Sequence, residues 1–324
     1  MSCLEAHSPR GICIEKSNMI YKNHHSEVNQ IKCSVVVAAF NEEKYLRDSL
    51  CSIVSQQGIN LEIIFVDDGS TDATLAIAQE ISQVDKRIKV YQNSKKGKCS
   101  AFNYGVEKAN GDYVCIFAGD DIMPQHSLRA RLDSIVTLGS DCPVIGLSKL
   151  ITMSEDKKFD GVVVPKASGV GALSGVSPMM NRKALSIVFP VPESLPNEDT
   201  WMELAALHLK QIKLVHSDVI ACQWRVHAGN SINMTEPFSV YSMKIAARKN
   251  ALPLFLSKFG QVLDFEEKTA LEAKMHCERM RVKGSVIGVL NSNVGLIDRL
   301  RALSITNSFF YEIRRSLYSL FSGF

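Results

Sequence analysis

Short apolar runs alternate with amphipathic stretches over the first 125 residues of the chain. Four of these runs are rich in β-branched or aromatic residues and predict buried strands: 33–39, 61–66, 88–91 and 112–118. Between successive runs, apolar residues recur every three or four positions, which predicts a helix in each interval. This alternation predicts βαβ units on a parallel sheet, so the expected fold class is α/β.

Polar clusters follow the predicted strands, at their ends or just beyond. These clusters are Asn41–Glu42, Asp67–Asp68, Lys98 and Asp120–Asp121. The carboxyl ends of parallel strands meet at one edge of a sheet, and ligands of open α/β sheets bind there. We therefore interpret the first half of the chain as a nucleotide-type binding platform.

Asp120 and Asp121 are two adjacent carboxylates at the end of the fourth predicted strand. Such groups repel each other unless a cation or a donor-rich ligand lies between them. A hard divalent cation with oxygen ligands, bound to a phosphate, meets that need. A solvated turn is the alternative, because a short motif match is only a hypothesis.

Composition excludes several classes of protein. Apolar residues make up 46% and charged residues 22% of the 324 positions, which are ordinary globular values. A net charge of +3 and the lack of an RNA- or DNA-binding motif argue against a nucleic-acid partner. The nine cysteines have no Cys-x-x-Cys spacing, and no apolar run is long enough for a membrane span. We expect a cytoplasmic protein with a flexible polar segment over residues 1–30.

Five ordered segments resemble family 2 glycosyltransferases of the GT-A fold: 34–43, 66–72, 101–105, 111–114 and 119–124. The resemblance is strong over about 31–125, weaker to about 235 and absent from the rest. It implies a GT-A domain over 31–235, with a Rossmann-like, mostly parallel sheet flanked by helices. Residues 236–324 would then form a C-terminal helical region.

The resemblance implies an inverting, metal-dependent transfer of a sugar from a nucleotide donor, most often UDP. By position, three residues would line the nucleobase pocket: Ala38, Phe40 and Glu42. Asp68 would hydrogen-bond the uracil, and Asp67 would support it. Lys98 and Asn103 match positions near the ribose and the diphosphate.

The implied metal site lies after the fourth strand. Asp120 and Asp121 match the family's Asp-x-Asp-type motif, which binds the ribose and a divalent metal, Mn²⁺ or Mg²⁺. Many members have a carboxylate where this chain has Ala118. His227, in a stretch similar to a Tyr-Arg-x-His motif, would complete the metal shell or contact the diphosphate, with Arg225 nearby. A structural role is the alternative for a lone histidine.

A general base is needed on the face of the sugar opposite the leaving group. Glu198 and Asp199 resemble the family's Glu-Asp pair at the start of a helix; Asp199 is the expected base and Glu198 the second candidate. Helix capping and the helix dipole are the alternative explanation for this pair. The glycine-rich segment 169–175 predicts close approach of a donor sugar or acceptor to the backbone. Arg182 after it resembles the family's pattern and would bind the donor; an exposed cation is the alternative.

From Pro237 onward the apolar spacing is helical, with predicted helices over 265–281 and 285–303. The end of the chain, 309–321, mixes aromatic residues with Arg314 and Arg315. Such a basic amphipathic helix can lie on an anionic membrane surface, which would suit a lipid-linked acceptor at the inner face of the cell membrane. Packing on the catalytic domain or on a partner subunit is the alternative.

The expected activity is transfer of a sugar to a glycan or lipid-linked acceptor in polysaccharide biosynthesis. A nucleotidyltransferase is one alternative, but its glycine-rich basic loop is expected after the first strand, where residues 40–43 are acidic. A non-catalytic sugar-nucleotide-binding or scaffold protein is a second alternative, suggested by Ala118. Against it, Asp120, Asp121 and Asp199 are all present.

Overall fold

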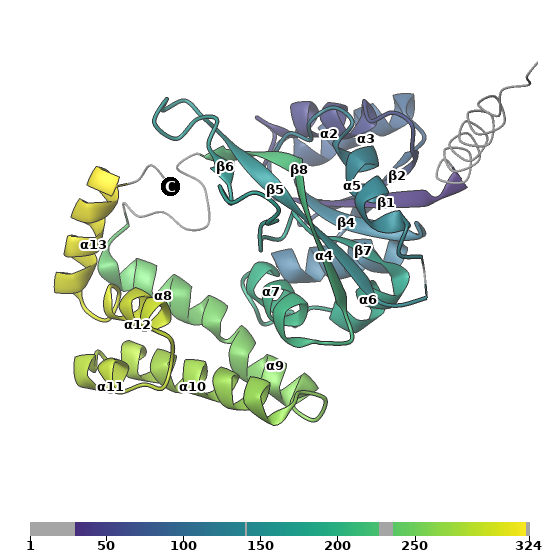
Figure 1. Ribbon diagram of the computed structural model, residues 1–324. Helices are drawn as coiled ribbons and strands as arrows, with labels where there is room; N and C mark the ends of the chain where they lie inside the picture. Colours follow the sequence, from purple (N-terminus) through teal and green to yellow (C-terminus); the bar gives the residue numbers. More distant parts are fainter. Residues whose placement is uncertain (1–29, 140, 227–235, 322–324) are drawn as a thin grey trace, which may run out of the picture.

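A computed structural model describes residues 30–139, 141–226 and 236–321 of the protein (Figure 1). At its centre is an eight-stranded sheet in the order β3-β2-β1-β4-β7-β5-β6, with β8 paired to β5. The predicted flexible segment over 1–30 lies outside the described residues, apart from Gln30.

The first four strands are parallel and match the predicted runs to within one residue at each end. They are β1 Lys32–Ala39, β2 Asn60–Asp67, β3 Ile88–Gln92 and β4 Tyr113–Ala118. Three helices connect them in turn: α2 Leu46–Val54, α3 Thr74–Val84 and α4 Lys98–Lys108. The predicted α/β class and parallel sheet are confirmed.

Successive side chains of the parallel strands point into two different helical layers. Three further helices complete these layers: α5 Ser127–Val136, α6 Arg182–Val188 and α7 Asp199–His208. Val35 and Val37 pack in a buried cluster with α2, α3 and α5, whereas Val36 packs with α4, α6 and α7. Figure 1 shows these layers on opposite faces of the sheet. Burial on both faces explains why the strands are continuous apolar runs.

The other half of the sheet mixes strand directions. It contains β5 Val144–Ser154, β6 Val163–Val164, β7 Met179–Asn181 and β8 Lys213–Val226. The short strand β7 is antiparallel to both β4 and β5, whereas β8 is parallel to β5. An isolated bridge joins Ile122 to Gln223, so the end of β8 lies against the loop that follows β4.

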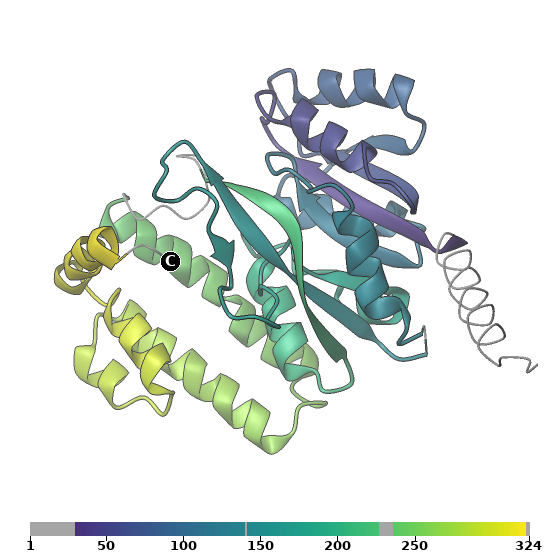
Figure 2. The ribbon, with the colours of Figure 1, turned by 45° about the horizontal axis from the view of Figure 1, so that its top comes forward.

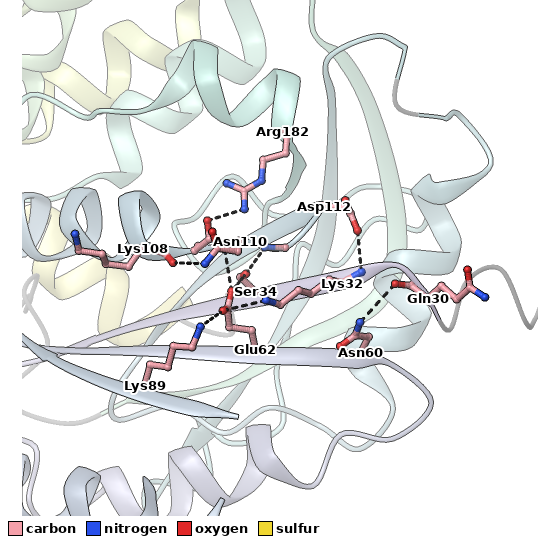
Figure 3. A network of polar contacts seen from close by, with 12 residues as sticks. Gln30, Lys32, Ser34, Asn60, Glu62, Lys89, Lys108, Asn110, Asp112 and Arg182 are labelled. Carbon is pink, nitrogen blue, oxygen red and sulfur yellow. Dashed lines mark hydrogen bonds and ion pairs between the residues drawn. The ribbon is translucent and has the colours of Figure 1, made fainter. Parts of the chain in front are cut away.

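A buried carboxylate, Glu62, joins three strands near the amino-terminal edge of the sheet (Figure 3). It accepts hydrogen bonds from Lys89 Nζ (2.7 Å), Ser34 Oγ (2.7 Å), Asn110 N (2.8 Å) and Lys32 Nζ (3.1 Å). Burial raises the pKa of this carboxyl, but the four donors outweigh burial and lower the pKa to about 2. Because all its donors come from the protein, we assign Glu62 a structural role.

Helices make up the described part of the chain after the sheet. They are α8 Phe238–Lys249, α9 Ala251–Phe259, α10 Phe265–Val282, α11 Val286–Leu290, α12 Leu296–Leu303 and α13 Ser308–Phe321. The prediction of a helix over 265–281 is confirmed. The prediction of one helix over 285–303 is wrong, because the poor helix formers of 291–295 separate α11 from α12. Among the described residues, no helix is both long and apolar enough to cross a membrane.

The helix α9 attaches the C-terminal helices to the α/β part of the molecule. Phe255 and Phe259 of α9 pack on Trp201 of α7, with ring centroids 5.5 and 5.8 Å away. Trp201 also donates a hydrogen bond from Nε1 to Val188 O at 2.8 Å. These rings are buried in the same cluster as Val36 of β1, so the two parts share a core. Figure 2 shows the C-terminal helices on the side of the molecule away from β1–β3.

Candidate active site

The loops that follow β1 and β2 are joined at the carboxyl edge of the sheet. Asn41 N donates to Ser70 Oγ (3.0 Å), and Thr71 N donates to Asn41 Oδ1 (2.8 Å). Glu42 N donates to Thr74 Oγ1 (2.7 Å). Asn41 has a φ of 56°, in the left-handed region that asparagine tolerates better than most residues. These contacts carry no signal in the sequence, because they depend on which loops become neighbours.

Asp67 and Asp68, at the end of β2, both accept hydrogen bonds from the protein. Asp67 is 1% exposed and accepts backbone N–H groups of residues 69–70. Asp68 Oδ1 accepts from Asn93 Nδ2 (2.7 Å), and both of its oxygens accept from Gly97 N at 3.0 Å. Asp68 therefore holds the loop after β3 in place, and its contact with a uracil stays a prediction.

Ala38 and Phe40 lie at the carboxyl end of β1. Ala38 is half-buried and in register with Val66 of β2 and Ala118 of β4. Phe40 follows the strand directly, and its side chain is 51% exposed. A small residue beside an exposed aromatic ring suits a flat base that stacks on the ring. The assignment of both residues to a nucleobase pocket stays a prediction.

Arg225, near the end of β8, holds the acidic pair that follows β4. Its backbone N donates to Asp121 Oδ1 (2.9 Å), and its Nε donates to the carbonyl of Asp120 (2.8 Å). Its guanidinium also lies 4.3 Å from the centroid of the Tyr45 ring. The structure thus brings Arg225 to the predicted metal-binding pair, a contact that joins positions more than 100 residues apart.

The carboxylates at this edge crowd one another. The pKa of Glu42 is raised to about 7, mainly by burial and then by the charges of Asp120 and Asp72, while Arg225 opposes the shift. Burial also raises the pKa of Asp121 to about 8, with a further contribution from Asp120. Burial is the main cause of both shifts and the charge of Asp120 adds to them; a bound cation would favour the ionised form of both carboxyls.

The donor types at this edge fit a divalent metal, although the described residues do not complete a site. Carboxylate oxygens are the ligands that Mg²⁺ and similar hard cations prefer. Within 30–139, 141–226 and 236–321, no three His, Cys, Asp or Glu side chains are grouped closely enough to hold a metal ion. His227, the third predicted ligand, lies outside the described residues.

Lys98 faces the second acidic group, at the start of α7. Its Nζ lies 3.2 Å from Glu198 Oε1. Desolvation lowers the pKa of Lys98, but Glu198, Asp199 and Asp120 raise it more, so the pKa lies above its usual value. Burial raises the pKa of Glu198 to about 7, since the carboxyl group is 1% exposed and only Oε1 has a partner in the described residues.

Asp199 is fixed by contacts outside its own helix. Its Oδ1 accepts from Gly175 N (2.8 Å), and its Oδ2 accepts from Asn197 Nδ2 (2.8 Å). Glu198 is at the N-cap position, but its side chain makes no capping hydrogen bond. Capping therefore does not explain this acidic pair. The sequence analysis did not single out Asn197, although it stands directly before the pair.

Two residues predicted to bind the donor form hydrogen bonds with other parts of the protein. The amide of Asn103 exchanges two hydrogen bonds of 2.8 Å with the backbone of Val191, which ties α4 to the segment after α6. Arg182 Nη2 donates to the carbonyl of Ala109 (2.6 Å), just beyond the end of α4. Figure 3 shows Arg182 near Asn110, at the amino-terminal edge of the sheet. We correct its predicted donor role, because the acidic clusters lie at the opposite edge.

A cavity of about 620 Å³ lies between α4 and α6, beside the acidic clusters and not within them. Asn103 and Arg182 are both in its wall. An ion pair of Lys95 with Glu193 (3.1 Å) is also part of the lining. Since these polar groups already have partners in the protein, we do not include the cavity in the candidate site.

The sheet and the helical layers on its two faces define an α/β fold of the GT-A type, with acidic groups at the carboxyl edge of the sheet. Residues 34–157 match the model of glycosyl transferase family 2. TuaG of Bacillus subtilis, named for a role in teichuronic acid biosynthesis, is 35% identical over 214 residues, which cover 59% of this chain and 82% of TuaG. The chain therefore belongs to glycosyl transferase family 2.

Other relatives match over about a third of the chain. Two uncharacterized glycosyltransferases of Haemophilus influenzae are 35% and 44% identical over 33% and 35% of this chain. The chain spans about two fifths of the length of these relatives, 43% and 40%.

Solved structures share the fold over most of the chain. TarS of S. aureus, residues 1–349 in complex with UDP-GlcNAc, has a TM-score of 0.56 and 21% identity, covering 86% of this chain and 83% of that one. The mannosyltransferase PcManGT of Pyrobaculum calidifontis, in complex with GDP-Man and Mn²⁺, has a TM-score of 0.55 and 15% identity, covering 96% and 97%. At these identities the likeness shows the fold alone, and it confirms the predicted GT-A architecture.

Proposed function

We propose that the protein is an inverting glycosyltransferase that moves a sugar from a UDP-sugar to a hydroxyl of a glycan or lipid-linked acceptor in polysaccharide biosynthesis. The observation that carries this proposal is the position of Lys98. Its ammonium pairs with Glu198, and the charge of Asp120 also raises its pKa, so Lys98 lies between the two acidic groups of the site. A cation between two groups of carboxylates is a suitable partner for the diphosphate of a nucleotide sugar.

Two relatives support the choice of donor and acceptor. TarS was solved with UDP-GlcNAc, which favours a UDP-sugar as the donor. A glucuronosyltransferase of Methanococcus voltae that acts on a dolichyl sugar phosphate is 29% identical over 166 residues, covering 50% of this chain and 45% of that protein. This relative favours a lipid-linked acceptor.

The departing diphosphate needs positive charge. Asp120 and Asp121, together with His227, would hold the Mn²⁺ or Mg²⁺ ion, which supplies Lewis-acid stabilisation of that charge when bound. Lys98 and Arg225 contribute positive charge from the protein itself. Phe40 and the neighbouring loops would receive the base, in line with their position at the carboxyl edge of the sheet.

Asp199 is the proposed general base. It takes the proton of the acceptor hydroxyl while the hydroxyl oxygen bonds to the anomeric carbon of the donor sugar. The bond from that carbon to the phosphate oxygen breaks, its electron pair leaves with UDP, and this single displacement inverts the anomeric centre. The side chain of Asp199 is 32% exposed, whereas that of Glu198 is 2% exposed and pairs with Lys98. Asp199 is therefore the better placed of the two to meet an acceptor.

The proposal predicts that UDP binds only with a divalent metal. Calorimetric titration of UDP and GDP, with and without Mn²⁺, should show Mn²⁺-dependent binding of UDP. Asp121→Ala should weaken this binding at least 10- to 100-fold, because it removes a charge that holds the metal. Asp133→Ala, which removes an exposed carboxylate on α5, is the control and should bind as the wild type does. Binding of GDP but not UDP would indicate a GDP-sugar as the donor. Absence of any nucleotide binding would contradict the proposed glycosyltransferase activity.

We also propose that the C-terminal helices contact the inner face of the cell membrane. Nine of the seventeen large apolar side chains that are exposed in the described residues fall within 282–317. On α12 they are Leu296, Ile297 and Leu300; on α13 they are Phe309, Ile313 and Leu317. On each helix this spacing places the apolar side chains on one face. Both helices are too short to cross a bilayer, so they suit a position along its surface.

The charge of these helices favours binding to an anionic lipid surface. Residues 282–321 contain five basic and two acidic side chains, a net charge of +3, which equals the net charge of the whole chain. Basic residues near an anionic membrane each contribute about 1 kcal/mol to binding. A lipid-linked acceptor would also be presented at such a surface.

The membrane proposal predicts binding to vesicles that contain phosphatidylglycerol and weaker binding to phosphatidylcholine alone. The double variant Phe309→Ser, Leu317→Ser should lower vesicle binding about tenfold or more, because it removes two apolar contacts. Val84→Ser, which changes an 87% exposed side chain of α3, is the control. Unchanged binding of the double variant would contradict the proposal. A dimer in solution that the double variant dissociates would assign the face to a second copy instead.

A further inference from the structure

Three buried polar atoms lack partners where the segment 169–175 meets the start of α7. They are Ser174 Oγ, Asn197 Oδ1 and Glu198 Oε2, none of which has a hydrogen-bond partner in the described part of the chain. Asn197 is 4% exposed and Glu198 is 1% exposed. Buried polar atoms in native proteins are almost always hydrogen-bonded to protein, water or a ligand, so three in adjacent segments offer a place where a polar ligand can bind.

The three atoms belong to one arrangement around Asp199. Gly175, next to Ser174, donates its N–H to Asp199 Oδ1 at 2.8 Å. A Cβ atom at Gly175 would lie 2.4 Å from Glu198 Oε1, so this backbone also touches the second carboxylate. Asn197 reaches Asp199 Oδ2 through its Nδ2 at 2.8 Å. Asn197 and Glu198 therefore directly precede the proposed base, and Ser174 is next to the glycine that bonds to it.

The unpartnered atoms define the chemistry of the ligand. Because Nδ2 of Asn197 donates to a carboxylate, its other amide atom, Oδ1, is an acceptor only. In its ionised form, paired with the Lys98 ammonium at 3.2 Å, Glu198 is also an acceptor only, whereas the Ser174 hydroxyl can accept or donate. A ligand that fits must offer several hydrogen-bond donors close together. Phosphate oxygens do not, but the neighbouring hydroxyls of a sugar ring do.

We propose that Ser174, Asn197 and Glu198 form a subsite for the hydroxyl groups of a sugar ring, an inference that rests on the proposed glycosyltransferase function. The ring belongs either to the sugar being transferred or to the acceptor. Asn197 is a positioning residue: one end of its amide orients Asp199, and the other end accepts a sugar hydroxyl. The same side chain thereby orients the base and binds the sugar.

The test separates nucleotide binding from sugar binding. Affinities of UDP, UDP-glucose, UDP-galactose and UDP-N-acetylglucosamine are measured with Mn²⁺ for the wild type, Ser174→Ala and Asn197→Leu. The matched control is Ser134→Ala, because Ser134 is also half-buried but bonds to Arg131 O in its own helix. If the subsite holds the donor sugar, at least one UDP-sugar binds the wild type more tightly than UDP. Each variant should then lose about threefold to tenfold of that preference while its affinity for UDP is unchanged.

A second measurement identifies an acceptor subsite. UDP release from the best UDP-sugar is followed with rising concentrations of methyl glucoside and methyl galactoside. If the subsite holds the acceptor, the preference for UDP-sugar is unchanged in the variants, but KM for the glycoside rises about threefold to tenfold in Ser174→Ala. Variants that match the wild type in both measurements, while UDP still binds, overturn the subsite alone. A wild type that binds no nucleotide overturns the proposed function as well.

Discussion

Replacement of Asp199 by asparagine is expected to lower kcat for sugar transfer about 1,000-fold, because a general base contributes roughly 10²- to 10⁴-fold to such reactions. The affinity for UDP and Mn²⁺ should stay within about twofold of the wild type, since the substitution leaves the edge formed by β1, β2 and β4 unchanged. The asparagine can still accept from Gly175 N through its Oδ1, and its Nδ2 can donate to Asn197 once the Asn197 amide turns over, so the site keeps its shape. The measurement is the initial rate of UDP release with a saturating acceptor, beside a calorimetric UDP titration.

Two other substitutions show whether the loss belongs to the base. Glu203→Gln neutralises a carboxylate one turn further along the same helix and should leave the rate within about twofold of the wild type. Glu198→Gln removes the carboxylate that holds the Lys98 ammonium in position at 3.2 Å, so it should weaken binding of the donor as well as slow the reaction. If Asp199→Asn is nearly as active as the wild type and Glu198→Gln is inactive with normal donor affinity, the roles of the two carboxylates are exchanged.

The strands could be predicted from sequence because their environment permits one pattern only. A central parallel strand covered by helices on both faces is largely apolar, and residues 35–39 of β1 and 63–66 of β2 are apolar without interruption. The position of the acidic pair at 120–121 could also be predicted. Because β4 is parallel to β1, the residues that follow β4 lie at the carboxyl edge of the sheet. Local sequence therefore determined this half of the site.

Arg182 shows where such reasoning fails. The glycine-rich segment 169–175 does reach the acidic pair of α7, and Arg182 follows it within a few residues. Between them, however, the short strand β7 runs antiparallel to β4, pairing Met179 with Cys115 and Asn181 with Tyr113. Three residues thus carry the chain to the amino-terminal edge. A strand of that length has too few positions to show a period in sequence.

Contacts of the site that join distant segments could not be predicted either. The backbone of Arg225 meets Asp121 only because β8 is long enough to pass the end of β4, which depends on its pairing with β5. The bond from Asn197 to Asp199 is short in sequence, but its significance appears only when Gly175 closes the other side of the carboxylate. These features arise from tertiary packing and carry no signal at the level of single elements.

Substitution of Gly175 is expected to lower activity as substitution of a catalytic residue would, although glycine has no side chain. A Cβ atom there would lie 2.4 Å from Glu198 Oε1 and 2.5 Å from Asp199 Oδ1, distances that no real contact tolerates. Gly175→Ala must therefore displace both carboxylates or the segment 169–175. A misplacement of about 1 Å at a reacting group can cost about 100-fold in rate, so we expect kcat to fall by about that factor.

The same substitution should spare the nucleotide site, because the loops after β1, β2 and β3 make their own contacts, such as those of Asn41 with Ser70 and of Asp68 with Asn93. UDP affinity should thus stay near that of the wild type while kcat falls. Gly295→Ala is the control, since a Cβ atom there meets nothing within 4 Å. Equal losses of UDP affinity and rate in Gly175→Ala would indicate a general collapse of the fold. A normal rate would show that Asp199 need not be held by this backbone to act as the base.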